Sequence, residues 1–319
     1  MDKFHGTFAA ARFIKEIGRG KKGARSLSRE DAFQLYEAML DGRASDLELG
    51  GIMLAMRIKG ESVDEIAGFL QAAEASFELL PVLSGNYAPV VIPSYNGSRR
   101  MANLTPLLAM LLAREGVPVL LHGVTNDPGR VTTAEILAAM DLPPLQEREA
   151  LSTHFAARQP AFMPIEVLAP RMARLLAMRR VLGVRNSTHT LVKLIQPFAG
   201  PALRLTSYTH PEYFSMLSAY FSAAAPLDRG DMFLMRGTEG ETVANAQRGQ
   251  QIDWFHQRQL TTLAQKQEPT DETAALPAAD AQSTAVWIQE VLAGKQAVPP
   301  AIAEQARHCL DVAKRLRTG

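Results

Sequence analysis

The chain has 319 residues, of which 47% are hydrophobic, so it can build the core of one large domain or two. No apolar run reaches the about 18 residues that a membrane-spanning helix needs, and the single cysteine, Cys309, excludes an internal disulfide and a cysteine-based metal cluster. The amino-terminal stretch MDKFHGTFAAARF also lacks the apolar core of a signal peptide, so we expect a cytoplasmic protein.

The first 80 residues have the pattern of a series of short helices. Each of three serines is followed by an acid three residues later, which is the pattern of a capping box: Ser28 with Asp31, Ser45 with Glu48, and Ser62 with Glu65. Apolar residues follow each serine at helical spacing. The sequence therefore predicts a small all-helical domain over residues 1–82.

From residue 88 the pattern changes to short β-rich runs that alternate with helical segments. The β-rich runs are VVIP at 90–93, PVLLHG at 118–123, AFMPIEV at 161–167, ALRLTSY at 202–208 and DMFLMRG at 231–237. This alternation predicts an α/β domain with crossover helices over residues 83–319. A further helix begins at Pro170 and runs through RMARLLAMRRVLG, and we expect part of the segment 170–190 to join the helical domain.

The net charge of +1 hides two strongly basic segments. Residues 167–211 carry seven basic residues and no acid: Arg171, Arg174, Arg179, Arg180, Arg185, Lys193 and Arg204. A second cluster near the amino terminus is interrupted by three glycines: Lys15, Arg19, Lys21, Lys22 and Arg25. Ordinary protein surfaces mix both signs of charge, so these segments, Arg204 excepted, predict contact with nucleic-acid phosphates. The alternatives are a solvated helix face for the first cluster and an ordinary surface loop for the second.

The loop PSYNGSRR at 93–100 follows a β-rich run and precedes a helix, an arrangement that favours anion binding. The residues that could contact phosphate are Ser94, Tyr95, Asn96, Gly97, Arg99 and Arg100, together with His122 and Gly123 at the end of the next strand. Tyr95 could equally stack on a base or pack in the interior. His122 has the position of a structural histidine at a strand end rather than of a catalyst.

Seven stretches of the chain together resemble one protein family. They are IKEIGRGK, DLELGG, RIKGE, VIPSYNG, ANLTPLLA, RNSTHTL and GTEGE. They are similar to the nucleic-acid-binding branch of the anthranilate phosphoribosyltransferase family, which has the nucleoside phosphorylase/phosphoribosyltransferase-type fold. The resemblance implies a homodimer with this glycosyltransferase fold that binds DNA and RNA and lacks the transferase activity of the parent enzymes.

The sequence departs from the enzymes at the positions that serve their chemistry. The enzymes' Gly-Thr-Gly-Gly-Asp phosphate loop corresponds to Pro93–Gly97, and their Lys-His-Gly-Asn stretch corresponds to Leu121–Val124. Their Mg²⁺-binding Asp-Glu pair falls at Thr242–Val243, so Glu239 and Glu241 are the carboxylates that remain nearby. We therefore expect no catalytic residue, metal, cofactor, small-molecule substrate or membrane contact, with nucleic acid as the partner. A phosphoribosyltransferase or phosphorylase with an altered acceptor remains the alternative.

Overall fold

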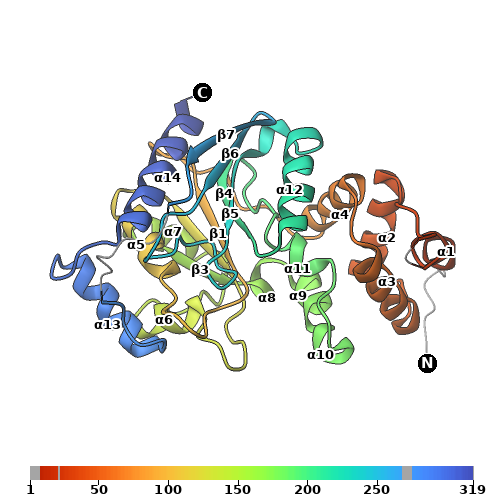
Figure 1. Ribbon diagram of the computed structural model, residues 1–319, viewed down its shortest axis with the longest axis horizontal. Coiled ribbons are helices and arrows are strands. Elements are labelled where there is room, and N and C mark those ends of the chain that lie inside the picture. Colours follow the sequence, from red (N-terminus) through yellow and green to blue (C-terminus); the bar gives the residue numbers. More distant parts are fainter. Residues whose placement is uncertain (1–7, 21, 268–274, 319) are drawn as a thin grey trace. The chain divides into compact units, whose positions relative to one another are not determined.

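The computed structural model describes residues 8–20, 22–267 and 275–318, and the chain forms two compact units (Figure 1). The first unit comprises residues 1–79, 169–197 and 216–225, and the second comprises residues 80–168, 198–215 and 226–319. Segment 169–197 therefore folds with the amino-terminal helices. Lys21, one of the predicted basic residues, lies outside the described residues.

The first unit is helical. Its helices are α1 (Ala11–Ile17), α2 (Arg29–Asp41), α3 (Asp46–Lys59), α4 (Val63–Ala75), α9 (Pro170–Ala177), α10 (Arg179–Leu182) and α11 (Thr188–Leu191), and α12 (Pro211–Ala223) has its carboxyl-terminal half here. The helix predicted from Pro170 is interrupted at Met178, so that α9 and α10 are separate helices. Gly183 ends α10 in the left-handed conformation with φ 72°, which glycine adopts without steric cost.

The predicted caps begin the helices of this unit. Ser45 and Ser62 form complete capping boxes at α3 and α4, while the Ser28 side chain accepts the backbone N–H of Asp31 at α2 without the return bond. Helices α2 and α4 approach closely at Gly68, where a Cβ atom would lie 2.3 Å from the carbonyl oxygen of Arg29. A residue without a side chain is therefore required at this crossing.

The second unit is built on a seven-stranded sheet. Its strands are β1 (Val90–Ser94), β2 (Val119–Gly123), β3 (Ala161–Pro164), β4 (Ala202–Tyr208), β5 (Gly230–Arg236), β6 (Ile252–His256) and β7 (Gln259–Ala264). They lie in the order β3-β2-β1-β4-β5-β6-β7, with β1 to β5 parallel and β6 and β7 antiparallel. A strand is present at each of the five predicted runs, which confirms the α/β fold, but in the third run residues 165–167 are helical. The hairpin of β6 and β7 was not predicted.

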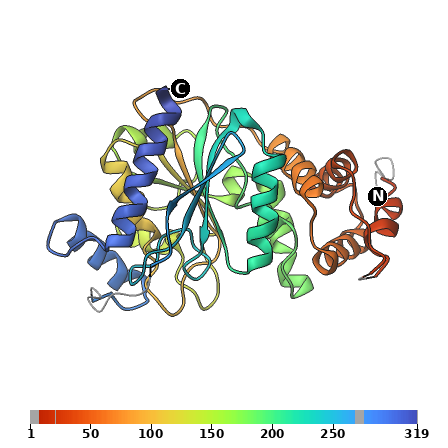
Figure 2. The same cartoon turned by 45° about the horizontal axis from the view of Figure 1, so that its top comes forward.

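Helices cover this sheet and complete its core. They are α5 (Thr105–Arg114), α6 (Thr133–Ala139), α7 (Leu151–Ala156), α8 (Ile165–Leu168), α13 (Ala281–Leu292) and α14 (Pro300–Thr318), with a 3₁₀ turn, η1, at Leu227–Arg229. Helix α14 packs against β4, β5 and α5, and α13 packs against α5 and α6 (Figure 2). Within residues 8–20, 22–267 and 275–318, no helix combines the length and the apolar character needed to cross a bilayer.

Candidate functional site

The predicted anion loop leaves β1 at the carboxyl edge of the parallel strands, where ligands bind in open α/β sheets. Ser94 ends β1 opposite Gly123, the last residue of β2. A Cβ atom on Gly123 would lie 1.7 Å from the Ser94 carbonyl oxygen, so the two strands can meet in this way only if residue 123 is a glycine. The Ser94 hydroxyl donates to Thr133 Oγ1 at 2.8 Å, which fixes the start of the loop.

The first half of the loop is bonded to the side chain of Glu241. The backbone N–H groups of Asn96 and Gly97 donate to Glu241 Oε1 at 2.9 and 2.7 Å. The Asn96 side-chain amide donates to the Gly240 carbonyl oxygen at 2.7 Å, and a Cβ atom on Gly240 would collide with that amide. Glu241 is 1% exposed, and its Oε2 atom has no hydrogen-bond partner within the described residues.

The second half of the loop is bonded to Glu239. The backbone N–H groups of residues 99–101 donate to the Glu239 carboxylate at 2.7, 2.8 and 3.0 Å. The side chains of Arg99 and Arg100 are exposed. From the sequence, Glu239 and Glu241 were expected only as carboxylates near the place of the enzymes' metal-binding pair. The stretch GTEGE carries no local signal that its two acids bind a loop more than 130 residues away.

Tyr95 of this loop, which is half-buried, forms a pair with the buried His122 at the end of β2. The Tyr95 hydroxyl and His122 Nδ1 are hydrogen-bonded at 2.7 Å, and the rings meet edge to face. Burial lowers the pKa of His122 to about 3 and raises the pKa of Tyr95 well above its usual value. His122 is therefore neutral at physiological pH, which is consistent with a structural role.

Thr242 and Val243, which the resemblance predicts at the place of the enzymes' metal-binding pair, lie in the interior. Val243 is 1% exposed and belongs to the apolar core of the second unit, and Thr242 is 1% exposed. The part of the chain that the structure describes contains no group of three or more His, Cys, Asp or Glu side chains that could hold a metal ion. A divalent cation needs several oxygen ligands, which the pair of residues 242–243 does not provide.

In the basic segment of the first unit, the arginines of α9 are bonded to α2. The Arg171 guanidinium forms an ion pair with Asp41 at 2.6 Å. Arg174 donates to the carbonyl oxygens of Met39 and Leu40, near the carboxyl-terminal end of α2, where positive charge is favourable. Both arginines are exposed, but their charges also serve to attach α9 to α2.

The two arginines of α10 are exposed. The side chains of Arg179 and Arg180 have no hydrogen-bond or ion-pair partner within the described residues. Val181 beside them is 78% exposed. Arg204, by contrast, is only 4% exposed in β4, so it does not belong to the basic surface.

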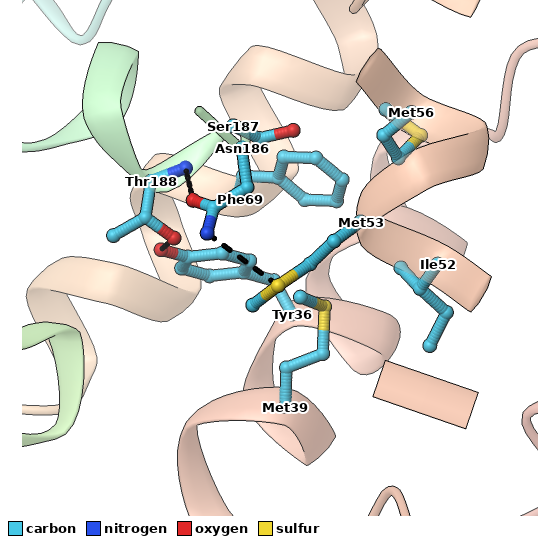
Figure 3. A pocket seen from close by; sticks show the side chains of 9 residues that line it. All are labelled: Tyr36, Met39, Ile52, Met53, Met56, Phe69, Asn186, Ser187 and Thr188. Atoms are coloured by element: carbon cyan, nitrogen blue, oxygen red, sulfur yellow. Dashed lines mark hydrogen bonds between the residues drawn. The ribbon is translucent and has the colours of Figure 1, made fainter. Parts of the chain in front are cut away.

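A set of buried polar contacts fixes the chain that follows α10 (Figure 3). Asn186 donates to the Leu175 carbonyl oxygen at 2.9 Å and to Met53 Sδ at 3.4 Å, and its Oδ1 atom accepts the Thr188 N–H at 3.0 Å. The Tyr36 hydroxyl donates to Thr188 Oγ1 at 2.9 Å. These bonds hold the turn between α10 and α11 against the amino-terminal helices.

The pKa of His189 in α11 depends on the positive charges of this segment. Burial is the main reason that the pKa of His189 falls to about 4, and the positive charges of Arg185, Arg179 and Lys193 lower it further. Three of the six basic residues predicted here therefore act on one imidazole.

The amino-terminal basic cluster is partly neutralised. Arg19 and Arg25 lie on either side of Glu16, at 2.5 and 3.8 Å from its carboxylate oxygens. Lys15 and Lys22 are exposed and have no ion-pair partner within the described residues. Two of the four described bases of this cluster are therefore partly neutralised, whereas the side chains of Arg179 and Arg180 on α10 have no such acidic neighbour within the described residues.

Comparisons with known proteins agree with the fold of both units. A family model for the glycosyl transferase family, helical bundle domain, matches residues 11–76. The uncharacterized protein YbiB of Escherichia coli K12 is 45% identical over 300 residues, covering 94% of this chain and 92% of YbiB. An anthranilate phosphoribosyltransferase of Bradyrhizobium diazoefficiens is 25% identical over 290 residues, covering 88% and 82% of the two chains. The crystal structure of anthranilate phosphoribosyltransferase from Thermus thermophilus superposes with a TM-score of 0.69 at 20% identity, covering 96% of this chain and 89% of that one.

Proposed function

Because the chain belongs to the family of Escherichia coli YbiB and has the fold of anthranilate phosphoribosyltransferase, we propose that it uses this fold to bind nucleic acid. In this proposal the protein is a homodimer that binds DNA or RNA through phosphate contacts and has lost the phosphoribosyltransferase site. Its partner is the phosphate backbone of a nucleic acid rather than a small substrate.

The observation that carries the proposal is the exposed positive charge of Arg179 and Arg180, which lie in a segment with two further basic residues. We call Arg179, Arg180, Arg185 and Lys193 the basic region. The side chains of Arg179 and Arg180 are exposed without a partner within the described residues. Burial is the main cause of the lowered pKa of His189, and the charges of Arg185, Arg179 and Lys193 add to it. Guanidinium and ammonium groups fixed on a folded scaffold suit the regularly spaced phosphates of a nucleic acid.

The anion loop supports the loss of transferase chemistry. Its backbone N–H groups are bonded to Glu239 and Glu241, whose negative charges would repel a phosphorylated substrate at the same place. In this proposal the buried residues Thr242 and Val243 take the place of the metal-binding carboxylates of the enzymes, as the resemblance implies. Calorimetry with phosphoribosyl pyrophosphate and Mg²⁺ tests the alternative. Heat of binding that the Asn96→Ala variant loses would favour an active transferase or phosphorylase.

We expect binding with little preference for base sequence. Phosphate contacts position a protein on nucleic acid, whereas reading the bases requires side chains that reach into a groove. Arg179 and Arg180 lie on α10, whereas Arg185 and Lys193 lie in the turns before and after α11. Helices α10 and α11 have four residues each, which is too short for a recognition helix.

Fluorescence anisotropy with a labelled single strand, its duplex and an RNA of the same sequence tests the proposal. We expect binding whose log–log salt slope is about 0.7 per contacted phosphate for single strands and about 0.9 for duplex DNA. The quadruple variant Arg179→Ala/Arg180→Ala/Arg185→Ala/Lys193→Ala should lose it. The control removes four exposed basic residues of the second unit, with Arg248, Lys295, Lys314 and Arg317 each changed to alanine. Absence of binding by the wild type at low salt, or an equal loss in the control, would contradict the proposal.

The dimer proposal rests on an apolar stripe of α3. Leu47, Leu54 and Ile58 are 88%, 42% and 66% exposed, and their spacing places them along one face of the helix. Around a twofold axis, the α3 stripe of one protomer would pack against the same stripe of its partner. The dimer would then present two basic regions to one nucleic acid.

Light scattering on the purified protein tests this arrangement. We expect twice the 34.8 kDa mass of the chain for the wild type, and the monomer mass for Leu47→Ser/Leu54→Ser/Ile58→Ser. Val286→Ser, at a residue that is 46% exposed on α13, is the control and should remain dimeric. A monomeric wild type, or a triple variant that stays dimeric, would argue against the stripe as the interface.

A further inference from the structure

The loop from Ser94 to Met101 has the form of a site for small anions. Five of its backbone N–H groups, at residues 96, 97, 99, 100 and 101, point at two carboxylates over distances of 2.7 to 3.0 Å. Gly97 has φ 62°, which reverses the chain between the two sets of N–H groups. Successive N–H groups in such a turn form a concave site that attracts negative charge.

The two carboxylates come from one short turn, which we call the acidic turn (residues 237–241). Thr238 and Glu241 exchange backbone hydrogen bonds at 3.0 and 2.9 Å, which close the turn. The Gly237 N–H donates to the Tyr208 carbonyl oxygen at 2.9 Å, and the Ser207 hydroxyl donates to the Gly240 carbonyl oxygen at 3.0 Å. The acidic turn is therefore held at the carboxyl end of β4, independently of its bonds to the loop.

The buried carboxylate of Glu241 is only half satisfied by protein groups. Its Oε1 atom accepts two N–H groups, while the Oε2 atom is buried with no partner within the described residues. Burial of a charged oxygen without a hydrogen bond costs free energy. The hydrogen bonds of Oε1 to the loop offset this cost. An apolar side chain could fill the same buried position, but it could not accept the two N–H groups of the loop.

We infer that the acidic turn is an internal ligand, which occupies the anion site of the loop and closes it to free oxyanions. The Glu241 carboxylate fills the part at residues 96–97, and the Glu239 carboxylate fills the part at residues 99–101. Removal of both carboxylates leaves five N–H donors around a space that suits a tetrahedral oxyanion such as inorganic phosphate. The inference concerns the second unit alone and does not depend on nucleic-acid binding by the first.

The variant Glu239→Ala/Glu241→Ala tests the inference. Its melting temperature should rise as inorganic phosphate replaces chloride at constant ionic strength, because a ligand that binds the folded state stabilises it. The wild type should show no such phosphate-specific rise. The matched control is Glu147→Ala/Glu149→Ala, which removes two exposed acids with the same spacing from the same unit and should behave as the wild type.

The amide signals of residues 96–101 provide a second measurement. In ¹H–¹⁵N spectra they should shift with added phosphate in the double variant at concentrations that leave the wild-type signals unchanged. If the double variant is unfolded, Glu239→Ala alone frees the N–H groups of 99–101, and phosphate should then shift these three signals only. A folded variant whose melting temperature and amide signals respond to phosphate no more than the control would overturn the inference. Nucleic-acid affinity, measured in parallel, should not change in either variant.

Discussion

Replacement of Arg179 and Arg180 by alanine should weaken nucleic-acid binding by about ten- to a hundredfold at low salt, since each lost phosphate contact is worth about 1 kcal/mol or slightly more. Replacement of Arg171 and Arg174 removes the same number of charges from the neighbouring helix and should weaken binding far less. The comparison separates the arginines that are available to phosphates from those that the fold already uses.

The physical reason lies in the partners of these side chains. The Arg171 guanidinium is 2.6 Å from the Asp41 carboxylate, and Arg174 donates to carbonyl oxygens of α2. A phosphate would have to compete with these bonds and would also approach the negative charge of Asp41. Arg179 and Arg180 have no such bonds within the described residues, so a phosphate meets their full charge.

Anisotropy titrations over a range of salt measure the difference. For a single strand, the log–log slope should fall by about 1.4 for Arg179→Ala/Arg180→Ala, which corresponds to two phosphate contacts. The pKa of His189, about 4 in the wild type, should rise in this variant because the charge of Arg179 is removed, and should not change in Arg171→Ala/Arg174→Ala. Equal losses of affinity in the two folded variants would show that net charge alone, rather than the unpaired arginines, determines binding.

The sequence predicted features that depend on nearby residues. Ser45 and Ser62 begin their helices and Gly183 ends α10 because a cap needs only residues within one turn of it. Hydrophobic patterning likewise revealed five strands of the sheet. The hairpin of β6 and β7 was missed because its two-residue turn consists of Gln257 and Arg258, with φ 46° and 65°. Such turns normally contain asparagine, aspartate or glycine, so the usual sequence signal is absent.

The candidate sites depend on pairs of residues that are far apart in the chain, and the sequence alone could not reveal these pairs. The absence of acids from residues 167–211 suggested that Arg171 is available to phosphates, but Arg171 is paired with a residue 130 positions away. The bond between Glu241 and the Asn96 N–H spans 145 positions. In both cases the charge of a side chain was evident, whereas its availability depends on a partner that only the folded chain brings near.

The stability of the helical unit that carries the basic region should fall strongly when a methyl group is added at the crossing of α2 and α4. We expect Gly68→Ala to lower the free energy of unfolding by about 3 kcal/mol, as overpacking of a close backbone contact does. A Cβ atom at this position would lie 2.3 Å from the Arg29 carbonyl oxygen and 2.8 Å from both Ala32 Cβ and the Phe33 nitrogen. These atoms belong to the rigid backbone of α2 or are attached directly to it, so the two helices would have to move apart.

Gly50→Ala is the matched control, because Gly50 also lies inside a helix of the same unit. The nearest atom to a Cβ there is a methyl group of Leu182 at 3.9 Å, which is an ordinary contact. Since alanine favours the helix over glycine by up to about 1 kcal/mol, this variant should be slightly more stable than the wild type. Urea denaturation, followed by circular dichroism at one protein concentration, measures both changes. If Gly68→Ala were as stable as Gly50→Ala, the close approach of α2 and α4 would be contradicted. The position of α2, which supplies Asp41 and the carbonyl oxygens to the arginines of α9, would then also be in error.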